Sequence, residues 1–403
     1  MRSTLFASTL AIALGITSPI VGAIGFPAVV AVQTVDQRLV KADQLRQQGK
    51  EQYQMGRVEA AVQSLQQALK LYREIKNRQG EGKTIHNLGV VYGSRGNNQQ
   101  AIKYSEQSLA IAREINDRQI EAASRVNLGN IYVSMRNYTK AIGYFEQSLA
   151  IAREIKDRKI EGASIASLGI AHSSLGNYDK AIGYLEQSLA IAREIKHRQG
   201  EGSSLGSLGN VYFSLRNYEK AIDHYKQSLT IARELKYRQG EGNLLVSLGT
   251  AHFSIKNYDR AIGYFEQSLT IARELRDRQG EGFSTSSLGT AHFYIGNYEK
   301  AIDYYKQSLT IARELKDRGD ERLALNNIGA TLEMQKKLDL AIVFYQQSIK
   351  VSESIRKDNR SLSQDRQDSH TRTVAETYHR LAKLLVDQGK ILEASKIIEL
   401  IEP

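Results

Sequence analysis

Residues 198–237 read RQGEGSSLGSLGNVYFSLRNYEKAIDHYKQSLTIARELKY, and residues 238–277 read RQGEGNLLVSLGTAHFSIKNYDRAIGYFEQSLTIARELRD. The second stretch repeats the first with few changes. A Leu-Gly pair recurs every 40 residues, with a weaker final copy: Leu88-Gly89, Leu128-Gly129, Leu168-Gly169, Leu208-Gly209, Leu248-Gly249, Leu288-Gly289 and Ile328-Gly329. Self-similarity at this period is typical of stacked repeat proteins, in which each unit packs mainly against its neighbours.

Each repeat is expected to form two helices. In the first clear copy, helix A covers about residues 81–96, and its apolar residues Ile85, Leu88 and Tyr92 are spaced by three and four. This spacing places them on one face of the helix. Helix B covers about residues 101–118 and has its own apolar stripe.

Small residues indicate close packing of the two helices. Gly89 in helix A and Ala101 in helix B lack bulk, so the helix axes can approach each other closely. The asparagine at the register of Asn97 precedes helix B and can accept a hydrogen bond from one of its free backbone N–H groups. Helix B is therefore expected to begin with a side-chain cap.

The junction between units carries two further expectations. The glycine at the register of Gly80 is predicted to break helix B before the next unit, which makes helix B the longer helix. Glu114 precedes Arg118 by four residues, an order that stabilises an exposed helix end by about 0.2–0.5 kcal/mol.

The composition supports a helical protein without a thiol site. The 403 residues include three prolines, all outside the central region, and helix-forming residues dominate. The absence of cysteine excludes disulfides, thiolate metal sites and a cysteine nucleophile. The net charge of +11 raises nucleic acid or an anionic surface as a distant alternative partner. Because acidic residues are interleaved throughout, solvated helix faces explain the charge better, and no nucleic-acid partner is expected.

The first 33 residues differ from the rest. After Arg2 no charged residue occurs until Asp36, and Leu5 to Gly22 is largely apolar. Small residues around Ala23 offer a cleavage site, and a second site lies near Ala31. This pattern predicts a secretory signal peptide, with an uncleaved membrane anchor as the alternative. Either way, the remainder is expected to be exported to the periplasm, a lumen or the medium, or to be held at a membrane.

The repeat resembles the tetratricopeptide repeat, whose signature is W-x2-L-G-x2-Y, then A-x3-F, then P. Leu208, Gly209, Tyr212, Ala221 and Tyr225 fit this signature. The tryptophan and the closing proline are absent, and the period is 40 rather than 34 residues. The long form is similar to the repeats of kinesin light chains and of spindle-orientation adaptors with Leu-Gly-Asn repeats. The resemblance implies an all-α, right-handed solenoid of antiparallel helix pairs.

The repeats predict the following organisation of the chain: a signal peptide or anchor at 1–33, a degenerate first repeat at 41–80, seven 40-residue units at 81–360, a polar linker at 361–373, and a degenerate last repeat at 374–403.

The C-terminal region has a second resemblance. Residues 351–356 (VSESIR), 362–364 (LSQ), 373–375 (TVA) and 391–394 (ILEA) are similar to the end of the repeat region in bacterial proteins that carry a CHAT, or caspase-like, peptidase domain after their repeats. This resemblance implies that the chain ends about where such a peptidase would start. An alternative function is therefore the regulatory or split half of a CHAT-type peptidase system, acting in trans.

Three patterns look catalytic or metal-binding, and each has a structural explanation. Residues 202–206 match G-x-S-x-G but open helix A without a preceding strand. Residues 80–84 (GEGKT) resemble the end of a P-loop but lack its first glycine and its strand. His172, His252 and His292 share a register with tyrosines, which indicates a half-buried core position. No enzymatic activity, cofactor or metal site is expected.

The resemblance implies that helix A forms a concave wall where partners bind. The exposed registers of helix A, those of Lys83, His86, Val90, Gly93 and Ser94, are uncharged along most of the chain. The predicted peptide-binding groove combines amide and hydroxyl side chains with a phenylalanine row: Asn130, Asn210, Phe213, Thr250, Phe253, Thr290 and Phe293. Packing of the phenylalanines against neighbouring helices is the alternative.

A second contact region is predicted at the C-terminal edge. The last helix carries more apolar residues than one stripe needs, among them Ile397, Ile398 and Ile401. An uncovered apolar face of this kind favours self-association or docking of a folded partner. The sequence as a whole predicts a non-catalytic scaffold that binds a protein or peptide partner.

Overall fold

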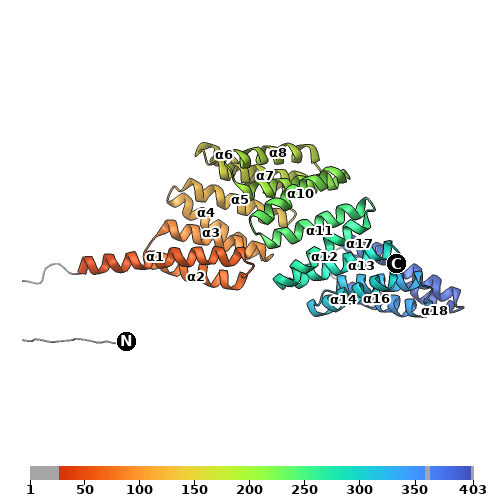
Figure 1. Cartoon of the computed structure of the whole chain (residues 1–403). Helices are drawn as coiled ribbons and strands as arrows, with labels where there is room; N and C mark the ends of the chain where they lie inside the picture. Colours follow the sequence, from red (N-terminus) through yellow and green to blue (C-terminus); the bar gives the residue numbers. More distant parts are fainter. Residues whose placement is uncertain (1–26, 359–363, 401–403) are drawn as a thin grey trace, which may run out of the picture. The chain divides into compact units, whose positions relative to one another are not determined.

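The computed structural model describes residues 27–358 and 364–400, and every regular element in these ranges is an α-helix (Figure 1). The helices form two compact units, Met1–Ile120 and Glu121–Pro403. Within each unit, consecutive helices pack against each other as antiparallel pairs, so the prediction of an all-α solenoid is confirmed. The helices are α1 (Pro27–Gln54), α2 (Val58–Glu74), α3 (Arg78–Ser94), α4 (Asn98–Glu114), α5 (Arg118–Ser134), α6 (Tyr138–Glu154), α7 (Arg158–Ser174), α8 (Tyr178–Glu194), α9 (Arg198–Ser214), α10 (Tyr218–Glu234), α11 (Arg238–Ser254), α12 (Tyr258–Leu275), α13 (Arg278–Tyr294), α14 (Tyr298–Leu315), α15 (Arg318–Met334), α16 (Leu338–Asp358), α17 (Gln364–Asp387) and α18 (Ile391–Glu399).

Helix A and helix B differ by at most one residue in the six helix pairs from α3 to α14, so the prediction of a clearly longer helix B is wrong there. The helices α9 and α10 each have 17 residues. The predicted break at Gly80 is also wrong, because Gly80 lies in the first turn of α3 and donates its N–H to the side chain of Asn77 at 2.7 Å. The chain instead leaves helix B at Lys76, whose φ is 54°.

This left-handed residue recurs at the end of helix B. Its position allows the following N–H to bond back into the helix, as Asn77 does to the Tyr72 carbonyl at 2.8 Å. A lysine or arginine occupies the position in every copy except Asn116, although glycine is the residue that adopts this conformation without steric cost. The residues concerned are Lys76, Asn116, Lys156, Lys196, Lys236, Arg276 and Lys316.

The asparagine caps are confirmed at most copies. The side chain of Asn217, for example, accepts from the N–H of Lys220 at 3.3 Å, where α10 begins. Asn177 makes no such side-chain bond. The capped copies are Asn97, Asn137, Asn217, Asn257 and Asn297.

The glycine of the Leu-Gly pair makes room for a large side chain of helix B. A Cβ atom on Gly249 would lie 2.5 Å from a ring carbon of Phe265, and one on Gly209 would lie 2.5 Å from the ring of Tyr225. Both rings are buried. The predicted close approach of the two helices is therefore confirmed, and the contact partner is the bulky residue sixteen positions after the glycine.

Successive repeats are joined by arginine–glutamate pairs. The buried Glu241 of α11 accepts from Nε of Arg233 in α10 at 2.8 Å and from Nη1 of Arg238 at 2.6 Å. Arg238 also pairs with Glu274 at the end of α12. The same chain of contacts recurs around Glu81, Glu161, Glu201 and Glu281.

The predicted pair of Glu114 with Arg118 is replaced by this network. Glu114 accepts from Nε of Arg78 at 2.9 Å, across its own repeat. The reason is that helix B ends at Glu114 and Arg118 begins the next helix, so one helical turn does not hold both residues.

The ends of the repeat region also differ from expectation. The helix pair α1–α2 forms the first repeat, and α17–α18 forms the last. The helix α17 already begins at Gln364, so most of the predicted linker at 361–373 belongs to it. Residues 1–26, which carry most of the predicted signal peptide, lie outside the described residues. Of the helices that the structure describes, none is both long and apolar enough to span a bilayer.

Two glycines of neighbouring helices test the packing constraint. We expect Gly249→Ala to destabilise the protein by about 1–3 kcal/mol because the new methyl group meets the Phe265 ring. Gly263→Ala is the control, since nothing lies within 4 Å of its Cβ position. Both changes gain about 0.5–1 kcal/mol of helix propensity, so only the contact distinguishes them. Thermal unfolding followed by circular dichroism measures both, and equal stability of the two variants would contradict the constraint.

The buried glutamates make stability depend on pH. Burial raises the pKa of Glu241, but hydrogen bonds from Arg233 and Arg238 outweigh it, so the pKa is lowered. A lowered pKa stabilises the fold above the unfolded value of about 4.3, and the stabilisation is lost as pH falls through the folded pKa. We expect Glu241→Gln to cost about 1.5–3 kcal/mol at pH 7 and far less at pH 3. Chemical denaturation at both pH values measures this, with Glu266→Gln on the exposed face of α12 as control. A cost that is unchanged at pH 3 would exclude the proposed ionic origin.

Candidate binding groove

One face of helix A in the repeat at 238–277 is uncharged from end to end. Asn243, Val246, Thr250 and Phe253 follow one another along α11 at spacings of three and four residues, so they share a face. The equivalent face of α13 carries Phe283, Ser286, Thr290, Phe293 and Tyr294. These two faces form the sides of the candidate groove.

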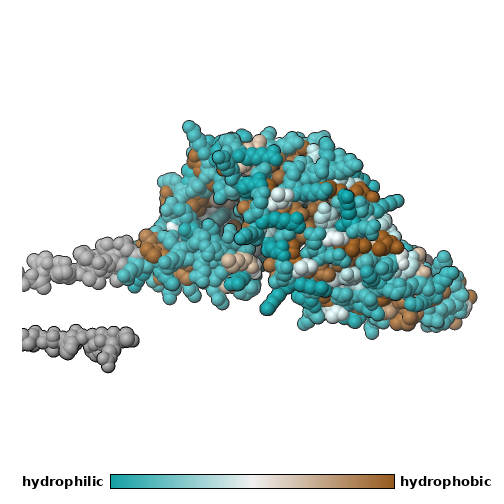
Figure 2. Space-filling model, viewed as in Figure 1, coloured by the Kyte–Doolittle hydropathy of each residue, from teal (hydrophilic) through white to brown (hydrophobic). Residues whose placement is uncertain are grey.

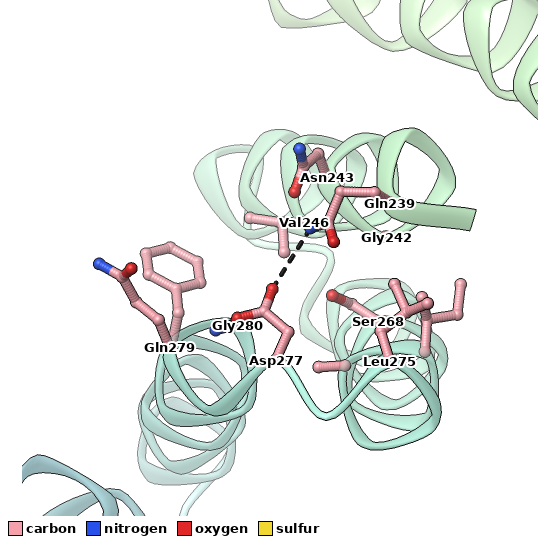
Figure 3. A pocket seen from close by; sticks show the side chains of 12 residues that line it. Gln239, Gly242, Asn243, Val246, Ser268, Leu275, Asp277, Gln279 and Gly280 are labelled. Carbon is pink, nitrogen blue, oxygen red and sulfur yellow. Dashed lines mark hydrogen bonds between the residues drawn. The ribbon is translucent and has the colours of Figure 1, made fainter. Parts of the chain in front are cut away.

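The first half of the groove is a hollow of about 400 Å³ between α11, α12 and α13 (Figure 3). Its floor comes from α12, and its sides come from the starts of α11 and α13. The lining is mainly apolar: Gly242, Val246, Ile271, Ala272, Leu275 and Phe283, with Gln239, Asn243, Ser268, Asp277, Gln279 and Gly280 completing it.

A hydrogen bond spans one rim of the hollow. Nε2 of Gln239 donates to Oδ2 of Asp277 at 3.3 Å, the bond drawn in Figure 3. Asp277 also caps α13, because its Oδ1 accepts from the N–H of Gly280 at 2.9 Å. The carboxylate is therefore held by the backbone and the amide. Phe283, which lines the same hollow, is 51% exposed.

The second half of the groove is an aromatic cluster. The ring of Phe253 lies 5.2 Å from that of Tyr258 and 5.2 Å from that of Tyr294, which it meets edge-on at 86°. Tyr258 and Tyr294 stack with their centroids 5.6 Å apart. Tyr294 also contacts Phe293, which in turn contacts Tyr298. The cluster therefore links two consecutive repeats.

The predicted amide and hydroxyl residues already serve as acceptors. Oδ1 of Asn210 accepts from the hydroxyl of Tyr225 at 2.8 Å, and Oγ1 of Thr290 accepts from that of Tyr305 at 3.1 Å. Burial raises the pKa of both tyrosines to about 12, so each phenol stays protonated and acts as a donor. The side-chain NH₂ of Asn210 remains the donor that this residue can offer to a peptide.

Comparisons with known proteins agree with this architecture. The sequence profile described as tetratricopeptide repeat matches residues 49–114, 119–194, 200–274 and 281–354. The chain belongs to the tetratricopeptide repeat (TPR) family. No curated protein matches the sequence.

Three solved structures resemble the TPR chain. The STAND protein with a TPR sensor from Pyrococcus horikoshii has a TM-score of 0.61 and 16% identity, over 93% of this chain and 51% of that one. Aspartyl phosphate phosphatase F from Bacillus subtilis has a TM-score of 0.51 and 15% identity, over 95% of both chains. The quorum sensor NprR from B. thuringiensis has a TM-score of 0.50 and 13% identity, over 82% of this chain and 98% of that one. At such identities the likeness shows the fold alone.

The structure brings some of the predicted groove residues together and separates others. Phe253 and Phe293 belong to one cluster because Tyr294 contacts both. Phe213 is half-buried and contacts Tyr218 instead, at 5.3 Å. Thr250 is half-buried and bonds back to the Val246 carbonyl, and the exposed Asn130 lies in an earlier repeat. The phenylalanines thus pack partly within the TPR stack while lining its helix A face.

The predicted half-buried core position is confirmed for His172 in this TPR chain, whereas His252 and His292 are more deeply buried than predicted. His252 and His292 are buried, and their rings stack on Tyr264 and Tyr304 at 5.4 and 5.5 Å. Burial lowers the pKa of both imidazoles, so they are neutral at physiological pH. In the part of the chain that the structure describes, no group of three potential ligands is placed to hold a metal ion.

The C-terminal edge has a different composition from the one predicted. Ile397 and Ile398 are half-buried against the core of the last repeats, and Ile401 lies outside the described residues. The exposed apolar residues of α18 are Ile391 and Leu392, the latter 81% exposed. In Figure 2, hydrophobic residues gather where Figure 1 labels α16 and α18. Self-association through this edge stays a prediction.

The sequence did not predict the hollow between α11, α12 and α13. It also did not predict that Tyr294 connects the aromatic residues of two repeats. Asn243 and Phe283 occupy the register of Lys83, and Val246 occupies that of His86, so both registers were already expected to be exposed. A further signal was available, because position 294 holds tyrosine where the earlier repeats hold serine: Ser94, Ser134, Ser174, Ser214 and Ser254.

Proposed function

We propose that this TPR chain is a non-catalytic scaffold that binds an extended segment of a partner protein along the helix A face of residues 198–317. The observation that carries the proposal is that one face of α11 and α13 has a hollow near the helix starts and the aromatic cluster of Phe253 and Tyr294 near the helix ends. Hollows with few polar groups and exposed aromatic rings are the usual features of binding sites.

The groove favours a peptide over a charged polymer. The groove faces of α11 and α13 carry no charged side chain. The one charged residue that lines the hollow is Asp277, at its rim. Nucleic-acid grooves combine stacking aromatics with basic side chains, and this face lacks the basic component. The surface in Figure 2 is mainly hydrophilic with separate hydrophobic patches, which agrees with a local binding site. Two similar structures are described as a TPR sensor and a quorum sensor, so related solenoids are named for sensing.

A displayed library of random peptides tests the proposal. We expect selected peptides to bind the purified protein, and Phe253→Ala to weaken them about tenfold or more because it removes the centre of the cluster. Phe253→Leu should retain more affinity, since it keeps apolar volume. Leu340→Lys is the control. Leu340 is 53% exposed on helix B of its repeat, and the equivalent residue of the preceding repeats is often lysine.

Circular dichroism must show that each variant remains folded. Selected peptides that bind Phe253→Ala as tightly as the original protein would place the site elsewhere and overturn the proposal.

We also propose that residues 1–33 direct export, with cleavage near Ala23 or Ala31. The support is the uncharged apolar run after Arg2. N-terminal sequencing of the native protein should begin near Ile24 or Val32. An intact Met1 in the membrane fraction would identify an anchor instead. A full-length product in the soluble cytoplasmic fraction would contradict both forms of the proposal.

A further inference from the structure

A ring near the end of helix A stacks on a ring of helix B in each repeat from α3–α4 to α13–α14, with centroids 5.3–5.5 Å apart. The stack is common to these repeats, but the residue in helix A is not. It is a tyrosine in some repeats and a histidine in others: Tyr92, Tyr132 and Tyr212, and His172, His252 and His292. Only histidine takes up a proton near neutral pH.

His252 in α11 is buried without a hydrogen-bond partner. It is 2% exposed, and neither ring nitrogen bonds to any group that the structure describes. The titratable groups that face it are Tyr264 and Arg260 of α12 and Lys226 of α10. A proton would give the ring a second N–H donor and a positive charge, with no acceptor and two cations nearby. Burial first, and then these cations, lower the pKa of His252.

His292 in α13 has a similar environment one repeat later. It is 5% exposed, and its Nδ1 bonds to no group in the described ranges. Tyr304 and Lys300 of α14 and Glu266 of α12 face the ring. The glutamate favours a proton, but burial and Lys300 oppose it more strongly, so the pKa of His292 is lowered as well.

The cation from helix B suits a tyrosine at this register but not a charged histidine. Nζ of Lys140 lies 4.2 Å from the centre of the Tyr132 ring and donates to its hydroxyl at 2.6 Å. Nζ of Lys220 lies 5.0 Å from the centre of the Tyr212 ring. A cation is attracted to the face of a tyrosine ring and repels an imidazolium. Histidine therefore fits this register only in its neutral form.

The two buried histidines belong to the repeats that form the candidate groove. His252 directly precedes Phe253 in α11, and His292 directly precedes Phe293 and Tyr294 in α13. Consecutive residues of one helix end share a backbone, so a displaced histidine also displaces the aromatic cluster. Because each repeat contacts mainly its neighbours, a repeat protein can open locally.

Acid favours such an opening. The stabilisation from a neutral, buried imidazole is fully present above the unfolded pKa of about 6.5. It decreases as pH falls below that value, because the opened histidine binds a proton that the closed form excludes.

We propose that proton uptake by His252 and His292 opens the ends of α11 and α13, so that the groove holds its partner at neutral pH and releases it in mild acid. This inference rests on the proposed peptide-binding function and specifies its regulation.

The probe is a fluorescent peptide selected from the library at pH 7.5, with blocked ends and without titratable side chains. Its anisotropy with the full chain is measured at pH 7.5 and at pH 5, which lies below the usual pKa of histidine and above that of carboxylates. We expect the original protein to lose about tenfold or more in affinity at pH 5. The double variant His252→Tyr/His292→Tyr should lose much less, because it carries the residue of the tyrosine repeats.

His172→Tyr is the matched control. It makes the same change at the same register in a repeat outside the groove, so it should lose affinity in acid as the original protein does.

Hydrogen exchange in the original protein gives a second measurement that needs no variant. After correction for intrinsic rates, the ends of α11 and α13 should exchange faster at pH 5 than at pH 7.5. The end of α5, which has Tyr132 at this register, should not.

Four results would overturn the inference. Equal loss of affinity in acid by the double variant and the original protein would place the acid-sensitive group elsewhere. Unchanged exchange at the ends of α11 and α13 would exclude the opening. A peptide that binds through Phe253 equally well at both pH values would leave the scaffold function standing and remove only its regulation. If the library yields no peptide at all, the proposed function fails, and the release of a partner fails with it.

Discussion

The missing side chain of the Leu-Gly glycine is the constraint on which the rest of the structure depends. A Cβ at Gly249 or Gly289 would occupy the space of the Phe265 or Tyr305 ring. A ring fills the equivalent space beside Gly129, Gly209 and Gly329, and Leu185 fills it beside Gly169, so helix A and helix B lie close and bury both apolar stripes. Because the same contact recurs every 40 residues, helix A and helix B keep the same pairing from repeat to repeat within each unit. The groove is a consequence of this regularity.

Contacts between repeats are polar as well as apolar, and this makes the stacking specific. The hydroxyl of Ser188 in α8 bonds to the Gly162 carbonyl of α7 and to the hydroxyl of Ser204 in α9, both at 3.0 Å. One buried serine thus connects three successive helices. The glutamates that bridge two arginines act similarly at the junction, where their burial would be costly without both partners. Such contacts restrict the offset between repeats, which apolar packing alone leaves less defined.

The period, the helix pairing and the core faces could be predicted from the sequence because the packing constraint repeats and therefore dominates the pattern. The end of helix B at Lys76 could not be predicted, because lysine rarely adopts a positive φ. Hydrogen bonds at the helix end stabilise this conformation. The partner of Glu114 depended on where helix B ends. The hollow beside Val246 could not be predicted either, because its existence depends on the distances between three helices. The residue pattern of a single helix does not contain those distances. The groove registers were predictable, whereas the joining of Phe253 to Phe293 by Tyr294 required the ring geometry.

Departures from the repeat at exposed positions bear on the proposed binding site. Variation at buried registers must still satisfy the packing of the two helices, so it carries little information about a partner. Exposed registers are free of that contact. Phe283 replaces the Ser203 and Asn243 of earlier repeats, and Tyr294 replaces Ser254, yet both aromatic side chains remain about half exposed. The part of each ring that stays exposed contributes no burial to the fold. Both departures lie in one repeat and on one groove face, and this coincidence supports the proposed binding site.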